Sequence, residues 1–229
     1  MGTLRILSRS SQAFADRIEA GRQLALELKD LQGKSAVVLG IPRGGMIVAR
    51  ELAAALQADL DMVIARKIGA PGNPELAIGA ISEDGNCFLD ERVISLTRSS
   101  AAYIDRAKAG ALAELRRRAS LYRQVRPQVP LADRTVVVTD DGVATGSTMQ
   151  ASLWSARQEK PVKLIAALPV GPEETLTSLA EYADEVLCLR APPFFDAVGR
   201  FYVHFDQTSD DELIEVLHQE AKRHTAEWH

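Results

Sequence analysis

The chain has 229 residues, 46% of them hydrophobic and 25% charged, a balance typical of a soluble globular protein with a buried core. Its net charge of −4 argues against general nucleic-acid binding through a basic surface, although a local basic pocket remains compatible with it. No apolar run reaches the ~20 residues that span a bilayer, and the N-terminus lacks a hydrophobic stretch of signal length, so we expect a cytoplasmic protein. Cys87 and Cys188 lie in apolar, strand-like contexts and are expected to be buried free thiols.

Apolar periodicity predicts alternating helices and strands in the first half of the chain. The predicted elements are a helix at 14–31, a strand at 35–40, a helix at 46–56, strands at 60–65, 76–81 and 87–90, and a long helix at 99–122. Ser11 is a plausible cap of the first helix. The segment Arg66 to Glu75 is rich in glycine and proline and is expected to form no regular element. The basic end of the long helix, ELRRRASLYR, is expected to be a solvated face rather than a binding patch.

The second half continues the alternation. Its predicted elements are a strand at 135–140, a helix at 147–157, a strand at 162–168, a helix at 172–182, strands at 185–189 and 201–205, and a last helix. That last helix is opened by a capping box, in which Ser209 is followed three residues later by Glu212.

Short, nearly all-apolar strands that alternate with helices predict an α/β fold: a doubly wound, mainly parallel sheet that is buried on both faces. We expect a single domain over residues 1–229. A helical insertion is expected at about 84–127, and a small hood with the C-terminal segment at about 190–229.

Two loops with unusual composition follow predicted strands, where open α/β sheets bind their ligands. The first is GIPRGG, at 40–45, and the second lies in VVVTDDGVATGST, at 136–148. In the second loop, small hydroxyl residues sit at a helix N-terminus, which is suited to phosphate. Asp140 and Asp141 precede them and suit vicinal sugar hydroxyls or Mg²⁺. The alternative is an acidic strand end followed by an ordinary helix cap, but the contiguous order favours a sugar-phosphate site.

The VVVTDDGVATGST segment resembles the ribose-phosphate signature of type I phosphoribosyltransferases, which use 5-phosphoribosyl 1-pyrophosphate (PRPP). It departs from the family pattern at Thr139 and Gly142, where apolar and branched aliphatic residues are usual. GIPRGG resembles the family's pyrophosphate loop, and RKIGAPGNPELAIGA resembles its flexible catalytic loop. Together with AFADRIEAGRQLA and AVGRFYVHF, these segments are similar to a bacterial phosphoribosyltransferase-like subgroup whose acceptor is unassigned.

The resemblance implies roles for individual residues. Asp140 and Asp141 would accept hydrogen bonds from the ribose hydroxyls, and Arg66 and Lys67 would close over the pyrophosphate, although Lys67 could equally be a surface lysine. The remaining PRPP-binding residues would be Arg43, Gly44 and Gly45 for the pyrophosphate and Ala144, Thr145, Gly146, Ser147 and Thr148 for the 5-phosphate. The catalytic residues would be Arg43, Lys67, Asp140 and Asp141. Mg²⁺ would be held mostly through substrate and water, beside the two aspartates.

The acceptor is not identified by the sequence. Ala144 stands where hypoxanthine-guanine enzymes carry an aspartate that serves the purine ring, so a 6-oxopurine enzyme that uses this base is disfavoured. The hood segment 191–207 offers Phe194 or Phe195 for stacking on a ring, beside Val198, but core packing of these aromatics is an equal alternative. A homo-oligomer is left open.

Two other functions compete with a transferase. The chain could be a regulator that binds PRPP or a nucleotide without turnover, although the complete loops around Arg43 and Lys67 argue against it. An aspartyl-phosphate phosphohydrolase would need two aspartates separated by one residue, which the adjacent Asp140 and Asp141 are not. The resemblance also implies that the Pro42–Arg43 peptide bond can be cis.

Overall fold

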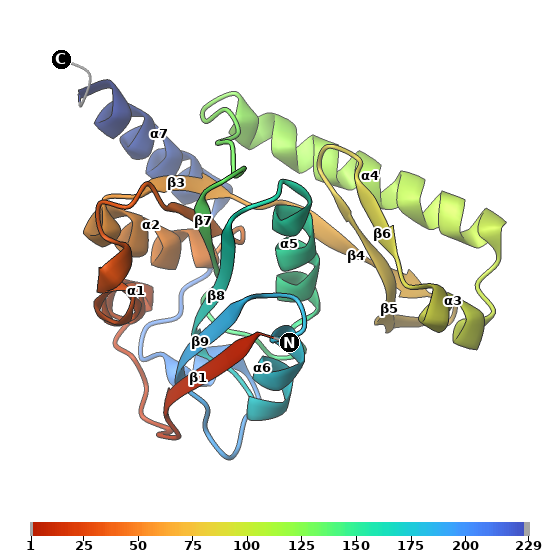
Figure 1. Ribbon diagram of the computed structural model, residues 1–229, viewed down its shortest axis with the longest axis horizontal. Helices are drawn as coiled ribbons and strands as arrows, with labels where there is room; N and C mark the ends of the chain where they lie inside the picture. The colour runs from red at the N-terminus through yellow and green to blue at the C-terminus, as the bar shows by residue number, and fades with distance from the viewer. Residues whose placement is uncertain (1, 227–229) are drawn as a thin grey trace.

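The computed structural model describes residues 2–226, and its centre is a parallel sheet of six strands (Figure 1). The strand order is β1-β9-β8-β7-β2-β3, with every neighbouring pair parallel. The strands are β1 (Thr3–Ser8), β2 (Val37–Gly40), β3 (Asp59–Met62), β7 (Thr135–Thr139), β8 (Lys163–Val170) and β9 (Glu185–Arg190). The expected α/β fold with a mainly parallel central sheet is confirmed.

Helices cover both faces of the central sheet. They are α1 (Arg17–Glu27), α2 (Gly45–Leu56), α5 (Ser147–Gln158), α6 (Glu173–Leu179) and α7 (Asp210–Ala226), with short 3₁₀ helices η1 (Lys29–Leu31) and η2 (Val198–Phe201). The side chains of strand β7 show why both faces of the sheet need a cover. Val137 packs into the core beneath α1 and α2, whereas Val136 and Val138 pack into the core beneath α5 and α6. The period of two in a strand therefore gives an apolar side chain to each layer.

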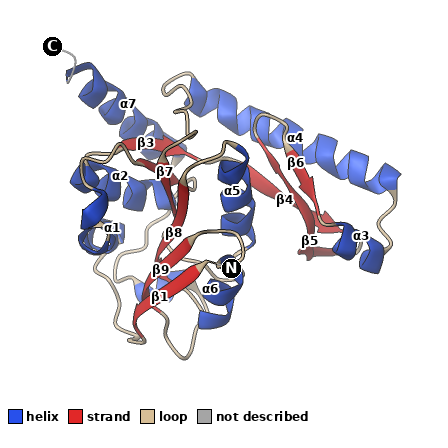
Figure 2. Ribbon diagram, in the orientation of Figure 1, coloured by secondary structure: helices blue, strands red, loops and turns tan. Residues whose placement is uncertain are grey.

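A second, antiparallel sheet extends to one side of the central sheet (Figure 2). It consists of β4 (Ala65–Ala70), β5 (Asn73–Ser82) and β6 (Cys87–Leu89), and it packs with α3 (Glu91–Thr97) and α4 (Ala101–Arg123). The region expected as a helical insertion thus also contains β6. One apolar core runs from Val38 in the central sheet to Ile68 and Ile78 in the second sheet and Leu115 in α4. This continuity supports the proposal of a single domain.

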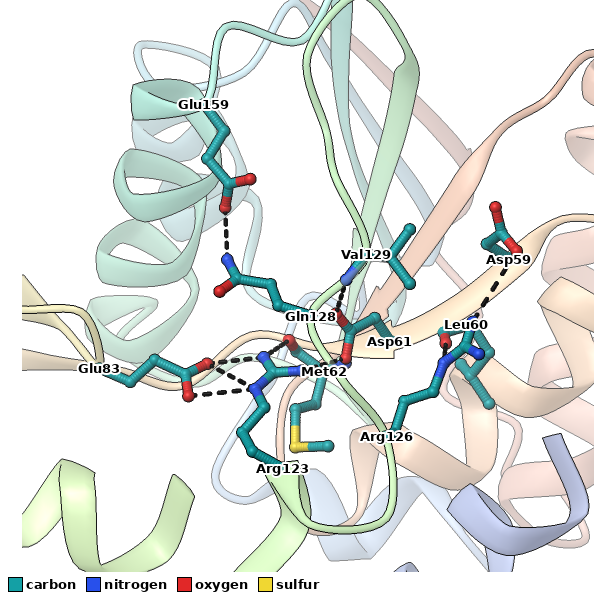
Figure 3. A network of polar contacts seen from close by, with 10 residues as sticks. All are labelled: Asp59, Leu60, Asp61, Met62, Glu83, Arg123, Arg126, Gln128, Val129 and Glu159. Atoms are coloured by element: carbon teal, nitrogen blue, oxygen red, sulfur yellow. Dashed lines mark hydrogen bonds and ion pairs between the residues drawn. The ribbon is translucent and has the colours of Figure 1, made fainter. Parts of the chain in front are cut away.

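A buried polar network joins the two sheets (Figure 3). Arg123, at the end of α4, donates from Nη1 to Oδ1 of Asp61 at 2.6 Å, and from Nε and Nη2 to Glu83 at 2.6–3.1 Å. It also donates to the Met62 carbonyl at 3.2 Å. Burial raises the pKa of Asp61, and the charge of Arg123 acts in the opposite direction. Arg123 therefore ties the ends of β3 and β5 to α4.

Several expectations are wrong in detail. The segment Arg66 to Glu75 belongs to an antiparallel hairpin, because Gly72 takes a positive φ of 74° in the turn and Gly69 lies at a shift of register. Glycine here marks a turn and a bulge, not an irregular loop. The segment at 201–205 forms no strand; it has a single bridge, between Phe14 and Tyr202, after η2.

The N-terminal part of the chain also differs from expectation. β1 was not predicted, because its TLRILS sequence has no clean alternation; it pairs in parallel with β9 at the edge of the sheet. Helix α1 begins at Arg17 and is capped by Asp16, whose side chain accepts from the Glu19 amide at 2.8 Å, and not by Ser11.

Other expectations are confirmed. Ser209 and Glu212 form the reciprocal capping box, with bonds of 2.7 and 3.1 Å. Both cysteines are free, with Cys188 buried as expected, but Cys87 is partly exposed because β6 lies at the edge of the second sheet. Within residues 2–226, no helix combines the length and apolarity needed to cross a membrane.

Candidate active site

The two loops singled out in the sequence meet at the carboxyl ends of neighbouring strands. β2 and β7 pair in register, with Gly40 opposite Thr139, so GIPRGG and the aspartate loop leave the sheet side by side. A Cβ on Gly44 would lie 2.0 Å from Oδ2 of Asp141, and one on Gly45 would lie 2.8 Å from Oδ1 of Asp140. The glycines are therefore required for close approach to the carboxylates.

The loop from Ala144 to Thr148 has the geometry of an anion site. Gly146 adopts a positive φ of 75° and turns the chain into α5, which no side chain caps at its N-terminus. Thr175 donates to the Ala144 carbonyl at 2.8 Å and fixes the loop from α6. Oγ of Ser147 and Oγ1 of Thr145 are 3.2 Å apart. Uncapped amides and two hydroxyls at a helix N-terminus together favour a phosphate group.

The aspartates lie in a partly buried, charged environment. Burial, and then the charge of Asp141, raise the pKa of Asp140 well above its usual range. Burial also raises the pKa of Asp141, but the hydrogen bond from Arg17 opposes this. Nε of Arg17 donates to Oδ2 of Asp141 at 2.8 Å, and the hydroxyl of Tyr202 donates to the Asp141 carbonyl at 2.6 Å. Arg17 thus favours the ionised form of Asp141, whereas burial favours the protonated form of its neighbour Asp140.

Cationic residues line part of a cleft of about 310 Å³. Its lining includes Pro42 of the first loop, Arg66 and Lys67 of β4, and Thr148 of α5. Arg43 lies beside this cleft and lines a neighbouring one of about 360 Å³, where its Nη1 is 3.8 Å from Oδ1 of Asp210. The Pro42–Arg43 peptide bond is cis, as expected. Thr148 of the expected phosphate loop therefore lines the same cleft as Arg66 and Lys67, Arg43 lines the neighbouring cleft, and Asp140 and Asp141 line neither of these two.

The expected acceptor residues are not placed together. Phe194 is 88% exposed, whereas Phe195 stacks on Phe201 at 5.2 Å between ring centroids and packs against the core. For Phe195 the structure therefore shows the core packing that the sequence left as an alternative. Val198 lies over the aspartate loop, because a Cβ on Gly142 would lie 2.7 Å from its Cγ1.

The two departures from the family pattern have structural reasons. Oγ1 of Thr139 is buried and donates to the Ala167 carbonyl of the adjacent strand at 2.7 Å, so the hydroxyl is satisfied inside the sheet. Gly142 is confined by Val198 and Val170, which leave no room for a branched side chain.

Three residues of the site were not predicted from the sequence: Arg17, Tyr202 and Phe205. The guanidinium of Arg17 lies 4.0 Å from the centroid of the Phe205 ring, and that ring stacks on Tyr202. All three lie in AFADRIEAGRQLA or AVGRFYVHF, the segments that carry the resemblance to the bacterial subgroup. The resemblance of these two segments to the subgroup was the sequence signal that could have indicated the three residues. It does not show that Arg17 contacts Asp141 or Phe205.

The carboxylates of the site suit a metal held mainly by other ligands. In the described part of the chain, no group of three or more His, Cys, Asp or Glu residues could hold a metal ion. Asp140 and Asp141 are only two carboxylates, and Arg17 engages one of them. This donor set fits Mg²⁺, which usually keeps several waters and binds substrate phosphates beside one or two carboxylates.

A parallel sheet with two carboxylates and an uncapped helix N-terminus at its strand ends defines an α/β protein with a candidate sugar-phosphate site, and comparisons with known proteins identify the family. The family described as phosphoribosyl transferase domain matches residues 12–206. The crystal structure of TT1426 from Thermus thermophilus is 42% identical, with a TM-score of 0.85, and covers 91% of this chain and 99% of that one. This chain belongs to the type I phosphoribosyltransferase family.

Two curated relatives come from Mycobacterium tuberculosis. They are named "Putative phosphoribosyl transferase MT0597" (strain CDC 1551 / Oshkosh) and "Putative phosphoribosyl transferase Rv0571c" (strain ATCC 25618 / H37Rv). Each is 48% identical to this chain over 204 residues, a match that covers 89% of this chain and 46% of the relative. The chain thus spans about half the length of the curated relatives that it matches.

Proposed function

We propose that the protein transfers the ribosyl 5-phosphate group of PRPP to a nucleobase-like or amine acceptor and releases pyrophosphate. The observation that carries this proposal is the packing of Gly44 and Gly45 against Asp141 and Asp140, beside the uncapped N-terminus of α5. This packing brings subsites for diphosphate, ribose hydroxyls and 5-phosphate to one edge of the sheet. The polarity of these groups suits the diphosphate, hydroxyls and 5-phosphate of PRPP.

In this proposal the chain binds and orients the substrate. The α5 amides and the hydroxyls of Ser147 and Thr148 hold the 5-phosphate, and the aspartates accept hydrogen bonds from the ribose hydroxyls. Arg43, Arg66 and Lys67 neutralise charge that develops on the leaving pyrophosphate. Mg²⁺, when bound, would supply further neutralisation of the diphosphate. Positioning and leaving-group stabilisation then account for most of the rate.

The acceptor remains unassigned within this proposal. Ala144 offers no general base, which disfavours a 6-oxopurine acceptor that depends on one. The exposed Phe194 is available to stack on a ring from solvent. We retain a cytoplasmic location and homo-oligomerisation as proposals.

The double variant Asp140→Asn/Asp141→Asn tests the site. Each lost charge-assisted bond is worth ~1.5–3 kcal/mol, so PRPP affinity measured by calorimetry should fall at least about tenfold. Urea denaturation checks that the variant folds, and Asp105→Asn on the exposed side of α4 is the matched control. Unchanged PRPP affinity in the folded variant would place the site elsewhere.

A regulator that binds PRPP without turnover is the competing function. Release of pyrophosphate from PRPP and Mg²⁺, measured across nucleobases and related amines, separates the two. Turnover with any acceptor supports the transferase. Tight PRPP binding with no release across the whole set supports the regulator.

A further inference from the structure

Helix α4 forms a wall of the candidate active site. The cleft of about 310 Å³ that contains Arg66 and Lys67 is also lined by Glu114, Arg118 and Tyr122 of this helix. Arg118 and Tyr122 also line the neighbouring cleft beside Arg43. Figure 1 shows α4 lying along the second sheet, with its C-terminal end at the junction with the central sheet. The basic stretch ELRRRASLYR was expected to be a solvated face, and Arg116 to Arg118 are exposed. Two of these arginines also line the clefts, Arg118 both of them and Arg117 the cleft beside Arg43.

Tyr122 ties this end of α4 to the pyrophosphate loop. Its hydroxyl donates to Oδ1 of Asp210 at 2.7 Å, and the same oxygen lies 3.8 Å from Nη1 of Arg43. Arg118 stands one turn earlier on α4, at the boundary between the two clefts. Its side chain is 55% exposed, so it is free to take another orientation.

Glu114 is the common partner of Arg66 and Arg118. It accepts a hydrogen bond from Nη1 of Arg66, in the β4 strand of the hairpin, and its Oε1 lies 3.3 Å from Nη2 of Arg118. The hydrogen bond from Arg66 lowers the pKa of Glu114, which keeps the carboxylate ionised. Arg66 comes from the hairpin and Arg118 from α4, and both pair with one anionic group. The same arrangement would let both guanidinium groups donate hydrogen bonds to one diphosphate.

We propose that Arg118 is a further residue of the diphosphate subsite, and that Glu114 is an internal carboxylate which holds Arg66 and Arg118 until a diphosphate displaces it. This inference rests on the proposed function. Both arginines exchange one carboxylate for phosphate oxygens, which carry more charge and offer more acceptors. The insertion is then part of the substrate site and not only a support for the hairpin.

Calorimetric titration with inorganic pyrophosphate in excess MgCl₂ tests the inference. Removing the competing carboxylate in Glu114→Gln should tighten pyrophosphate binding about two- to fivefold, the range of an exposed ion pair. Removing a phosphate ligand in Arg118→Gln should weaken it about tenfold. Arg116→Gln is the control, because Arg116 is on the same helix but lies beside the turn at Gly85, outside both clefts.

The sign of the Glu114→Gln effect decides between two roles. If Glu114 only tethers the hairpin to α4, its loss should leave pyrophosphate binding unchanged or weaker, and that result would overturn the inference. An Arg118→Gln variant that binds like Arg116→Gln would do the same. The Asp140→Asn/Asp141→Asn variant, titrated with PRPP in parallel, reports on the proposed function separately. A wild-type chain that binds neither pyrophosphate nor PRPP removes both proposals.

Discussion

Arg17 and Asp141 are 124 positions apart in the chain, yet Nε of one lies 2.8 Å from Oδ2 of the other. Only 11% of the Arg17 side chain and 15% of the Asp141 side chain are exposed. Arg17 also donates from Nη1 to the Asp206 carbonyl at 2.8 Å. One guanidinium at the start of α1 therefore connects the ribose-binding candidate Asp141 to the end of the hood segment.

Replacing Arg17 should destabilise the fold and weaken the site together. Breaking a buried ion pair from one side typically costs about 3 kcal/mol, because the remaining charge has no partner. We expect Arg17→Gln to lower the free energy of unfolding in urea by about that amount. Arg22→Gln is the comparison, since Arg22 pairs with Glu51 but is 71% exposed, and it should change stability by less than about 1 kcal/mol. An equal loss of unfolding free energy in Arg17→Gln and Arg22→Gln would mean that the buried Arg17–Asp141 pair contributes no more to stability than an exposed pair.

Asp140 should make stability fall as the pH rises. Burial and the charge of Asp141 raise its pKa above the ordinary value of 3.8. Between that value and the raised one, the folded state holds the proton more tightly than the unfolded state, so stability decreases with increasing pH. Asp140→Asn removes this penalty and should gain stability over the wild type on going from about pH 4 to neutral pH. Denaturation curves at several pH values measure it; a constant difference would contradict the assignment.

Gly44 should tolerate no side chain. An alanine Cβ would lie 2.0 Å from Oδ2 of Asp141, so the loop or the carboxylate must move. We expect Gly44→Ala to cost about 1–3 kcal/mol of stability and to reduce PRPP affinity. Gly110→Ala is the control, because a Cβ there meets nothing within 4 Å and Gly110 lies inside α4. That change should stabilise the protein by about 0.5–1 kcal/mol.

The hairpin formed by β4 and β5 should become more protected when substrate binds. Its turn at Gly72 faces open space, since a Cβ there would meet nothing within 4 Å, and closure over the site would exclude water. Hydrogen exchange across Arg66 to Glu75, with and without PRPP and Mg²⁺, measures the change, and peptides from β8 serve as the internal reference. Identical protection would show a fixed hairpin, and Lys67 would then have no part in closing the site.

Arg123 should be essential for joining the two sheets. It is held by Asp61, which is 1% exposed, and by Glu83. We expect Arg123→Gln to destabilise the protein by about 3 kcal/mol or more, because the buried Asp61 and the partly buried Glu83 lose their cationic partner. Arg117→Gln on the exposed side of the same helix should change the urea midpoint little. A small loss for Arg123→Gln would mean that the apolar core alone holds the second sheet.

The sequence by itself determined the features that depend on neighbouring residues. The alternation of short apolar strands with helices predicted the fold class. The run from Val136 to Thr148 contains, in order, a buried strand, two carboxylates and a helix start without a cap, so its local chemistry predicted the core of the candidate site. The capping box at Ser209 was equally visible, since both partners lie within one helical turn.

Only the tertiary structure decided what depends on distant segments. The half-exposed strand β1 is recognisable only once β9 offers its edge, because an irregular TLRILS pattern carries no periodic signal. Arg17 meets Asp141 across the fold, and Glu114 of α4 meets Arg66 of the hairpin. A charged side chain is compatible with many surroundings, so its sequence context does not reveal its partner. The packing of the helices onto the sheets fixes which charges meet, and that packing is a property of the whole core.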